Sequence, residues 1–189
     1  MVNFLLYPAI KTLNFNVMKN ILLGLLSFLL LGCCVAQPPT PGSYVTNNNI
    51  DKFVGTWKWV SGNDEIIFKL AKFRHTVTNY DEDIILGSHS YIQNENLIEN
   101  SLDKFNNLGN NHKDRSIYAW NDPTVSQNKI EGVIKDISKH KDLEILMEYI
   151  PGSSPAQVIV TLSYKHQTLT KDNQQPGMTL PVTFTLIKQ

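Results

Sequence analysis

The stretch from Lys52 to Gly62, KFVGTWKWVSG, decides the fold of this chain. Three large apolar side chains, Phe53, Trp57 and Trp59, fall on one face of an extended strand, with polar residues between them on the other face. This period of two is typical of a β-strand that is buried on one side only. The stretch therefore predicts the opening strand of a β-domain.

The same alternation recurs along the rest of the chain. Regular runs of it predict strands at 66–70, 143–149, 158–164 and 180–186, and less regular ones at 84–86, 90–93, 97–99, 117–120 and 129–137. Roughly eight to ten short strands separated by turn residues indicate an all-β domain. We expect a single antiparallel meander closed into a barrel, because closure removes unpaired strand edges. An open two-sheet sandwich is the alternative.

The amino-terminal segment has the composition of an export signal. Residues 21–32, ILLGLLSFLLLG, form an apolar run preceded by Lys19. A helix needs about 20 residues to cross a bilayer, so this run is too short to span one. Its length suits a signal peptide instead, and Met18 is a more ordinary start for one than Met1. Residues 1–33 are thus expected to be the signal region.

The exit from this run offers two processing sites. The sequence LLGC, from Leu30 to Cys33, resembles the lipobox of bacterial lipoproteins, which implies a lipid anchor on Cys33. Alternatively, cleavage after Ala36 would release a periplasmic or secreted protein. The residues that follow, 34–49, are rich in proline and asparagine and predict a flexible tether before a β-domain at 50–189.

Charge and cysteine content exclude several functions. The two cysteines, Cys33 and Cys34, both lie in the export segment, so the β-domain has no disulfide and no thiol nucleophile. After the apolar run, 15 basic side chains face 17 acidic ones. Such a balance gives no electrostatic basis for binding nucleic acid.

The opening strand resembles that of the calycins, which include the lipocalins and the fatty-acid-binding proteins. Gly55, Thr56 and Trp57 match their G-x-W motif, and the resemblance implies a barrel in which Trp57 closes one end. Calycins also carry an arginine late in the chain, but residues 156–189 contain none. The resemblance therefore implies the barrel and not the binding of a lipid carboxylate.

The chain also resembles an uncharacterised family of short exported bacterial β-domains. That family opens on F-x-G-x-W-x-W, which Phe53, Gly55, Trp57 and Trp59 match. This resemblance implies an envelope location and a β-domain, and no activity.

Signals of catalysis or metal binding are weak. The five histidines lack the short spacings of metal sites, and no hydrolase or phosphate-loop motif occurs, so we expect no metal, no cofactor and no catalytic residue. The alternating acids from Asn79 to Asp83 predict a solvated turn, because the glycine and glutamate of a calcium loop are missing. Large side chains that could form a core or line a pocket are Phe53, Trp57, Trp59, Phe68, Trp120, Tyr149 and Phe184.

These observations favour a non-catalytic envelope protein. Its barrel would bind a small apolar or amphipathic molecule, provided the interior is not filled by side chains, or it would bind another envelope protein. One alternative is an envelope hydrolase that uses carboxylates, with Glu144 or Glu148 as candidates. The other is a purely structural envelope protein.

Overall fold

A computed structural model of the chain describes residues 39–109, 111–164 and 174–189. The export segment, with Cys33, the expected lipobox and both processing sites, lies outside these residues. The part of the chain that the structure describes is almost entirely β, with three short 3₁₀ helices. None of its helices is long and apolar enough to cross a membrane.

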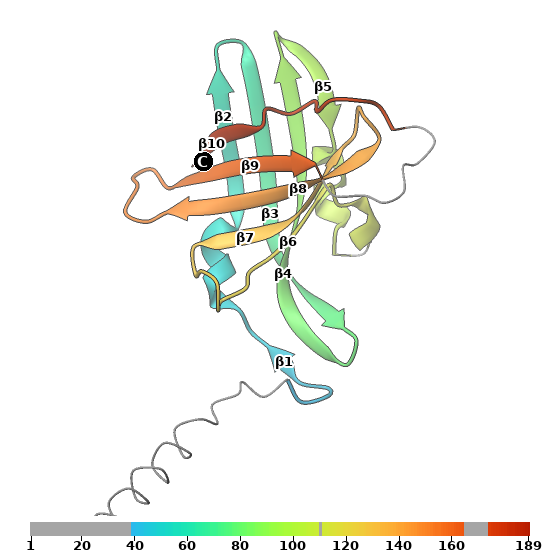
Figure 1. The fold of residues 1–189 in the computed structure, drawn as a ribbon, viewed down its shortest axis with the longest axis vertical. Coiled ribbons are helices and arrows are strands. Elements are labelled where there is room, and N and C mark those ends of the chain that lie inside the picture. The colour runs from blue at the N-terminus through green and yellow to red at the C-terminus, as the bar shows by residue number, and fades with distance from the viewer. Residues whose placement is uncertain (1–38, 110, 165–173) are drawn as a thin grey trace, which may run out of the picture. The chain divides into compact units, whose positions relative to one another are not determined.

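Within the described residues, ten strands and three 3₁₀ helices follow one another (Figure 1). In order they are β1 (Tyr44–Val45), η1 (Asn48–Phe53), β2 (Gly55–Ser61), β3 (Asp64–Val77), β4 (Tyr80–Gln93), β5 (Asn96–Asn100), η2 (Leu102–Asn107), η3 (His112–Asp114), β6 (Ile117–Trp120), β7 (Lys129–Asp136), β8 (Lys141–Ile150), β9 (Gln157–Tyr164) and β10 (Thr183–Lys188).

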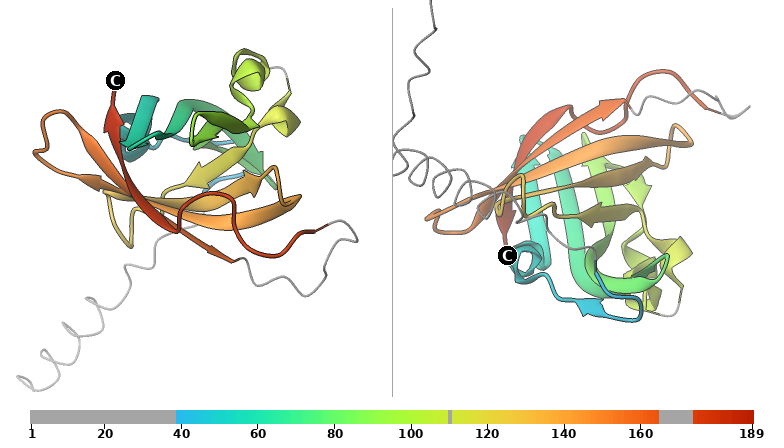
Figure 2. Two further views of the ribbon diagram at one scale, coloured as in Figure 1. Left: turned by 90° about the horizontal axis from the view of Figure 1, so that it is seen from above. Right: turned by 60° about the horizontal axis from the view of Figure 1, so that its bottom comes forward.

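Eight of these strands form the expected closed barrel. Strands β2, β3, β4, β6, β7, β8, β9 and β10 pair in that order, each antiparallel to the next, and β10 pairs with β2 to complete the ring. In Figure 1, β7–β10 cross in front of β2–β4, and the view from above in Figure 2 shows these two groups of strands on opposite sides of the barrel. The antiparallel barrel predicted from the alternation is confirmed, and the open sandwich is not what forms.

Strand β4 joins the two halves of the barrel. One edge of β4 pairs with β3 along its whole length, and the other edge is shared by three short strands. Going along β4, these partners are β1 at Asp81 and Glu82, β6 from Ile85 to Gly87, and β5 from Ser90 onward. Because β1 and β5 cover the rest of this edge, closure through the short β6 leaves little of β4 unpaired.

The segment before residue 50 is part of the fold. Composition assigned residues 34–49 to the tether, yet Tyr44–Val45 form β1 and Asn47 caps η1 by accepting a hydrogen bond from the Asn49 N–H. Phe53, which alternation placed in the first strand, belongs to η1, and the strand itself begins at Gly55. The cause is local: the Asn-rich run supplies the side chain that caps a helical turn.

The β3–β4 hairpin corrects the expected acidic turn. Only Thr78 and Asn79 form the turn, and the acidic residues lie in β4. Asp83 is only 4% exposed and pairs with Lys72 at 3.1 Å. A carboxylate at this position is therefore a buried partner rather than a solvated one.

The two ends of the barrel differ. At one end, η1 leads into β2, and Trp57 lies fully buried with its indole N–H donating to the Phe53 carbonyl at 2.7 Å. Lys188 on β10 places its ammonium 5.2 Å from the centre of the Trp57 ring. The last strand thus places a cation over the face of the buried tryptophan. The opposite end, where β7 turns into β8, carries the polar residues described next.

Candidate functional site

The barrel interior is filled by side chains. A continuous apolar cluster contains Phe53, Trp57, Phe68 and Phe184, all between 0% and 4% exposed. Phe184 contacts both Phe68 and Trp59, each with ring centres 5.9 Å apart. The partly buried Trp59 and Tyr149 pack against the same cluster. Six of the seven large residues expected in a core or pocket are therefore packing residues of one core.

Trp120 is the exception, because it lies outside this core and lines an outer groove instead. It follows Tyr118 on the outward parity of β6 and is 36% exposed. Ala119 takes the inward position beside it and is fully buried. Because side chains alternate across a strand, burying Ala119 puts the larger Trp120 on the outer surface.

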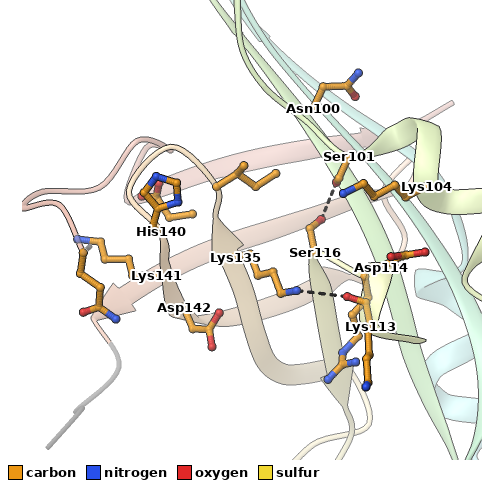
Figure 3. Close-up of a pocket in the computed structure, with 14 residues that line it drawn as sticks. Asn100, Ser101, Lys104, Lys113, Asp114, Ser116, Lys135, His140, Lys141 and Asp142 are labelled. Carbon is orange, nitrogen blue, oxygen red and sulfur yellow. Dashed lines mark hydrogen bonds between the residues drawn. The ribbon is translucent and has the colours of Figure 1, made fainter. Parts of the chain in front are cut away.

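A cleft of about 390 Å³ opens at the end of the barrel opposite Trp57 (Figure 3). Four parts of the chain form it: the link from β5 to η2, the approach from η3 to β6, the turn between β7 and β8, and Gln174 in the segment before β10. Its main lining side chains are Ser101, Lys104, Lys113, Asp114, Arg115, Ser116, Lys135, Asp136, His140, Lys141 and Asp142.

The cleft is rich in cationic side chains. Five come from four elements or their links: Lys104, Lys113, Arg115, Lys135 and Lys141. Three carboxylates, Asp114, Asp136 and Asp142, share the lining with them. This excess contrasts with the region after the apolar run, where acids outnumber bases.

The cations differ in how firmly they are held. Lys141 donates to the carbonyls of Gln175 and Gly177, and Arg115 lies 5.1 Å from the Tyr118 ring centre. Lys135 makes a long hydrogen bond of 3.4 Å to the Lys113 carbonyl. Within residues 39–109, 111–164 and 174–189, the ammonium group of Lys104 has no hydrogen-bond or ion-pair partner.

Beneath the cleft lies a fully enclosed chain of polar groups. His89 on β4 contacts Glu99 through Nε2 at 2.7 Å and Ser116 through Nδ1 at 2.7 Å. The Ser116 hydroxyl lies 2.9 Å from that of Ser101, which donates to the His89 carbonyl at 3.0 Å. All four residues are at most 4% exposed. A buried polar group costs free energy unless it is hydrogen-bonded. These hydrogen bonds therefore supply partners to polar groups that the apolar interior of the barrel would leave unpaired.

The network continues to a pair of carboxyl groups, Glu99 and Asp136. Burial would raise the pKa of Glu99, but His89 and the Ser138 N–H, which donates at 2.8 Å, together lower it. The pKa of Asp136 is raised, first by burial and then by the neighbouring Glu99 carboxylate, although Thr179 donates to Asp136 twice. Of these two adjacent buried carboxyls, Glu99 is therefore the one whose ionised form is favoured, and Asp136 is the one that holds a proton more readily.

The carboxylates proposed from sequence for a hydrolase lie elsewhere. Glu144 and Glu148 are on the outer face of β8, where Glu144 accepts from the Ser163 hydroxyl at 3.2 Å and Glu148 pairs with Lys129 at 3.3 Å. Glu144 lines a separate outer groove of about 490 Å³ together with Trp120. Their strand positions are about 13 Å apart, beyond the usual glycosidase separation of about 5–9.5 Å.

Metal ligation finds no geometric support in the described residues, where no group of three His, Cys, Asp or Glu side chains could hold an ion. His89 is committed to Glu99 and Ser116, and His75 and His112 pack against the rings of Tyr118 and Phe73.

Sequence reasoning missed the cleft and the buried network. One signal was readable: in ILGSHSYI, His89 occupies the same strand face as the inward Ile85 and Tyr91. A histidine on a core face predicts a buried polar partner. The cleft has no comparable signal in the sequence, because its cationic side chains come from segments that are brought together only when the barrel closes.

The fold and the site define the protein as a small, closed antiparallel β-barrel with a polar cleft at one end. The chain belongs to a family of unknown function, DUF6705, which it matches over residues 18–189. No curated protein and no solved structure matches it.

Proposed function

We propose that this chain is an exported, lipid-anchored, non-catalytic protein of the bacterial envelope that binds a small molecule in the cleft at the end of its barrel. One observation carries the proposal: the barrel interior is filled, whereas the cleft offers about 390 Å³ beside it. Binding sites for small organic molecules commonly have volumes of about 300–1,000 Å³.

The cleft constrains the shape of the ligand. An apolar carrier needs a hollow barrel, and here Phe68, Leu143 and Phe184 occupy the interior. The cleft is lined by polar and charged groups, with Ile137 as its one large apolar side chain. The ligand is therefore amphipathic, with a polar end that enters the cleft and an apolar part that stays outside or lies along its rim.

The proposal that the protein is exported depends on the expected signal region, residues 1–33. The family match includes the apolar run and Cys33, and it begins at Met18, where a signal peptide would start. A domain held together without disulfides suits this location, because its large apolar core can supply the stability alone.

Native mass spectrometry tests the binding proposal on protein purified from its own host. We expect a co-purifying small molecule that is lost from Lys135→Trp, where an indole fills the cleft from β7. Val60→Trp is the matched control, since Val60 is an exposed strand residue on β2, outside the cleft lining. Equal occupancy in both variants, or an empty wild type that binds nothing from a lipid and metabolite panel, contradicts the proposal.

Hydrolysis is the second candidate function, and one observation favours it. Ser116 lines the cleft, and its hydroxyl contacts His89, which contacts Glu99 in turn. A serine, a base and an orienting carboxylate in this order can generate a nucleophile. It ranks second because His89 is fully enclosed, so its imidazole has no open path to protonate a leaving group.

A serine-directed fluorophosphonate distinguishes the two candidates. Hydrolysis predicts covalent labelling of Ser116, abolished in Ser116→Ala and retained in Ser163→Ala, which changes an exposed serine on β9. Non-catalytic binding predicts no labelling above that of the Ser116→Ala variant.

A further inference from the structure

We infer that the cleft recognises a phosphate group, the polar end of its ligand, and that Lys104 and Lys135 are the residues that bind it. This inference rests on the proposed function and names the chemical class of its ligand.

Positive charge is concentrated at this one site. Five cationic side chains line the cleft of a domain in which acids are in excess. The same lining holds three carboxyls, so the cations outnumber them; burial raises the pKa of Asp136, and Asp114 accepts a hydrogen bond from Asn107 at 2.9 Å. A concave wall with an excess of positive charge raises the local concentration of anions.

The two central lysines approach from opposite walls. Lys104 extends from η2 and Lys135 from β7, and both side chains lie between these elements in Figure 3. Among the described residues, the Lys104 ammonium has no partner, and the Lys135 ammonium makes only the 3.4 Å hydrogen bond to the Lys113 carbonyl. Their ammonium groups thus hold donors that an incoming anion can use without breaking a strong interaction.

Lysine as the binding residue points to phosphate rather than carboxylate. A planar carboxylate is best matched by the planar fork of arginine, whereas lysine acts as a point charge. The one arginine of the cleft, Arg115, already donates to the His112 carbonyl and packs on Tyr118. A tetrahedral phosphate, with oxygens directed toward several walls, fits ammonium groups that arrive from different elements.

A phosphate fills only part of the cleft, so it is one end of a larger molecule. Two sources have this chemistry: a free phosphate ester and the headgroup of a phospholipid at the membrane to which the protein would be anchored. The shared group, a phosphate monoester or diester, is what the cleft recognises.

Isothermal titration measures the affinity for glycerol phosphate, with inorganic phosphate as a second probe. We expect saturable binding by the wild type and about a tenfold or greater loss in Lys104→Gln/Lys135→Gln, since each substitution removes a charged donor. The matched control is Lys58→Gln/Lys129→Gln, which removes the same charge from lysines paired with Glu65 and Glu148 outside the cleft lining. Equal losses in both double variants, or no binding by the wild type, overturn the inference.

Vesicle flotation separates the two sources. A lipid headgroup is identified if the β-domain, residues 39–189, floats with phosphatidylglycerol vesicles but not with vesicles of a neutral glycolipid, which carries no phosphate. This flotation should be lost in Lys104→Gln/Lys135→Gln and kept in Lys58→Gln/Lys129→Gln. If the protein binds glycerol phosphate in the titration but does not float with the vesicles, the ligand is a free phosphate ester. If Lys135→Trp loses the host ligand while Lys104→Gln/Lys135→Gln keeps it, the cleft binds a ligand but the phosphate assignment is wrong.

Discussion

Trp57 shows how one side chain closes a barrel end. Its ring is fully buried, its indole N–H donates to the Phe53 carbonyl, and the Lys188 ammonium lies over its face. Gly55 makes the last contact possible, because a Cβ there would approach the Lys188 Cε to 3.1 Å and its φ of +129° suits only glycine. The G-x-W pattern is thus a packing device at this end of the barrel.

Removing the Trp57 ring should therefore be costly. We expect Trp57→Ala to lower the free energy of unfolding by about 3–5 kcal/mol, because it empties a large buried site. Trp120→Ala is the control: Trp120 is 36% exposed, and we expect a loss below about 1 kcal/mol. Urea unfolding followed by far-ultraviolet circular dichroism measures both. A loss below about 1 kcal/mol for Trp57→Ala would contradict its role in the core.

At the scale of single elements, Asp83 holds the β1–η1 segment to β4. Its carboxylate accepts from the Tyr44 hydroxyl and from the Asn47 N–H at 2.8 Å, and it pairs with Lys72. Burial would raise the pKa of Asp83, but these three donors together lower it below its ordinary value. The ionised form is thus favoured by folding.

Acidification should release this attachment. A carboxyl whose pKa is lowered on folding stabilises the protein above its unfolded pKa of about 3.9, and the contribution is lost as the pH falls through the folded pKa. We expect Asp83→Asn to lose about 1–3 kcal/mol at pH 7, with the difference from wild type narrowing below about pH 4. Urea unfolding at a series of pH values measures this, and a difference that stays constant with pH would contradict it.

Gly132 lets β6 and β7 approach each other where the barrel closes. A Cβ at this position would come within 1.9 Å of the Tyr118 carbonyl oxygen and 2.6 Å of the Ala119 Cα. Both neighbours are backbone atoms, so the strands themselves would have to move. We expect Gly132→Ala to cost about 3 kcal/mol or more in urea unfolding.

Gly109→Ala is the comparison for Gly132. A Cβ at Gly109 would meet only the Phe73 ring edge, at an ordinary 3.7 Å. We expect its effect to stay within about 0.5 kcal/mol, as for most surface substitutions. Equal effects at the two glycines would mean that β6 and β7 separate easily, and that the barrel is less firmly closed than its register indicates.

Strand β4 shows why the alternation of apolar residues did not predict every strand correctly. Alternation identified β8 and β9, where one face is buried and the other is in water. In β4 every residue from Asp83 to Tyr91 is buried, because Leu108 and Phe105 cover its outer face. With both faces covered the period of two disappears, so the pattern gave two short strands where one of 14 residues forms.

For the whole molecule, closure could be predicted but the site could not. Alternation with turn signals specifies antiparallel neighbours, and edge protection then favours a ring. Whether a ring is hollow depends on how its inward side chains interlock, which no single strand reveals. The cleft depends on the ring being closed, since Lys104 and Lys135 lie on segments 31 positions apart in the chain. Whether the barrel is a hollow carrier could therefore be decided only from the structure, in which Phe68 and Phe184 pack inside it.

Lipidation at Cys33 is a proposal that the full chain can test. If Cys33 is the lipidated residue, Cys33→Ala should move the protein from the membrane fraction to the soluble fraction or stall it as an unprocessed precursor. Cys34→Ala is the matched control and should stay membrane-bound, because Cys34 occupies the next position and would not carry the acyl chains. Several chains are needed for stable attachment, since one gives only marginal binding.

Fractionation of host cells, with immunoblotting and the mass of the mature amino terminus, distinguishes the alternatives. A lipoprotein begins at an acylated Cys33, whereas cleavage after Ala36 leaves a soluble protein that begins at Gln37 and is the same in both cysteine variants. The second outcome would contradict the anchor and leave the barrel free in the periplasm or medium. The phosphate-binding cleft would then meet soluble esters more often than lipid headgroups, so the location of Cys33 also bears on which source of phosphate the protein encounters.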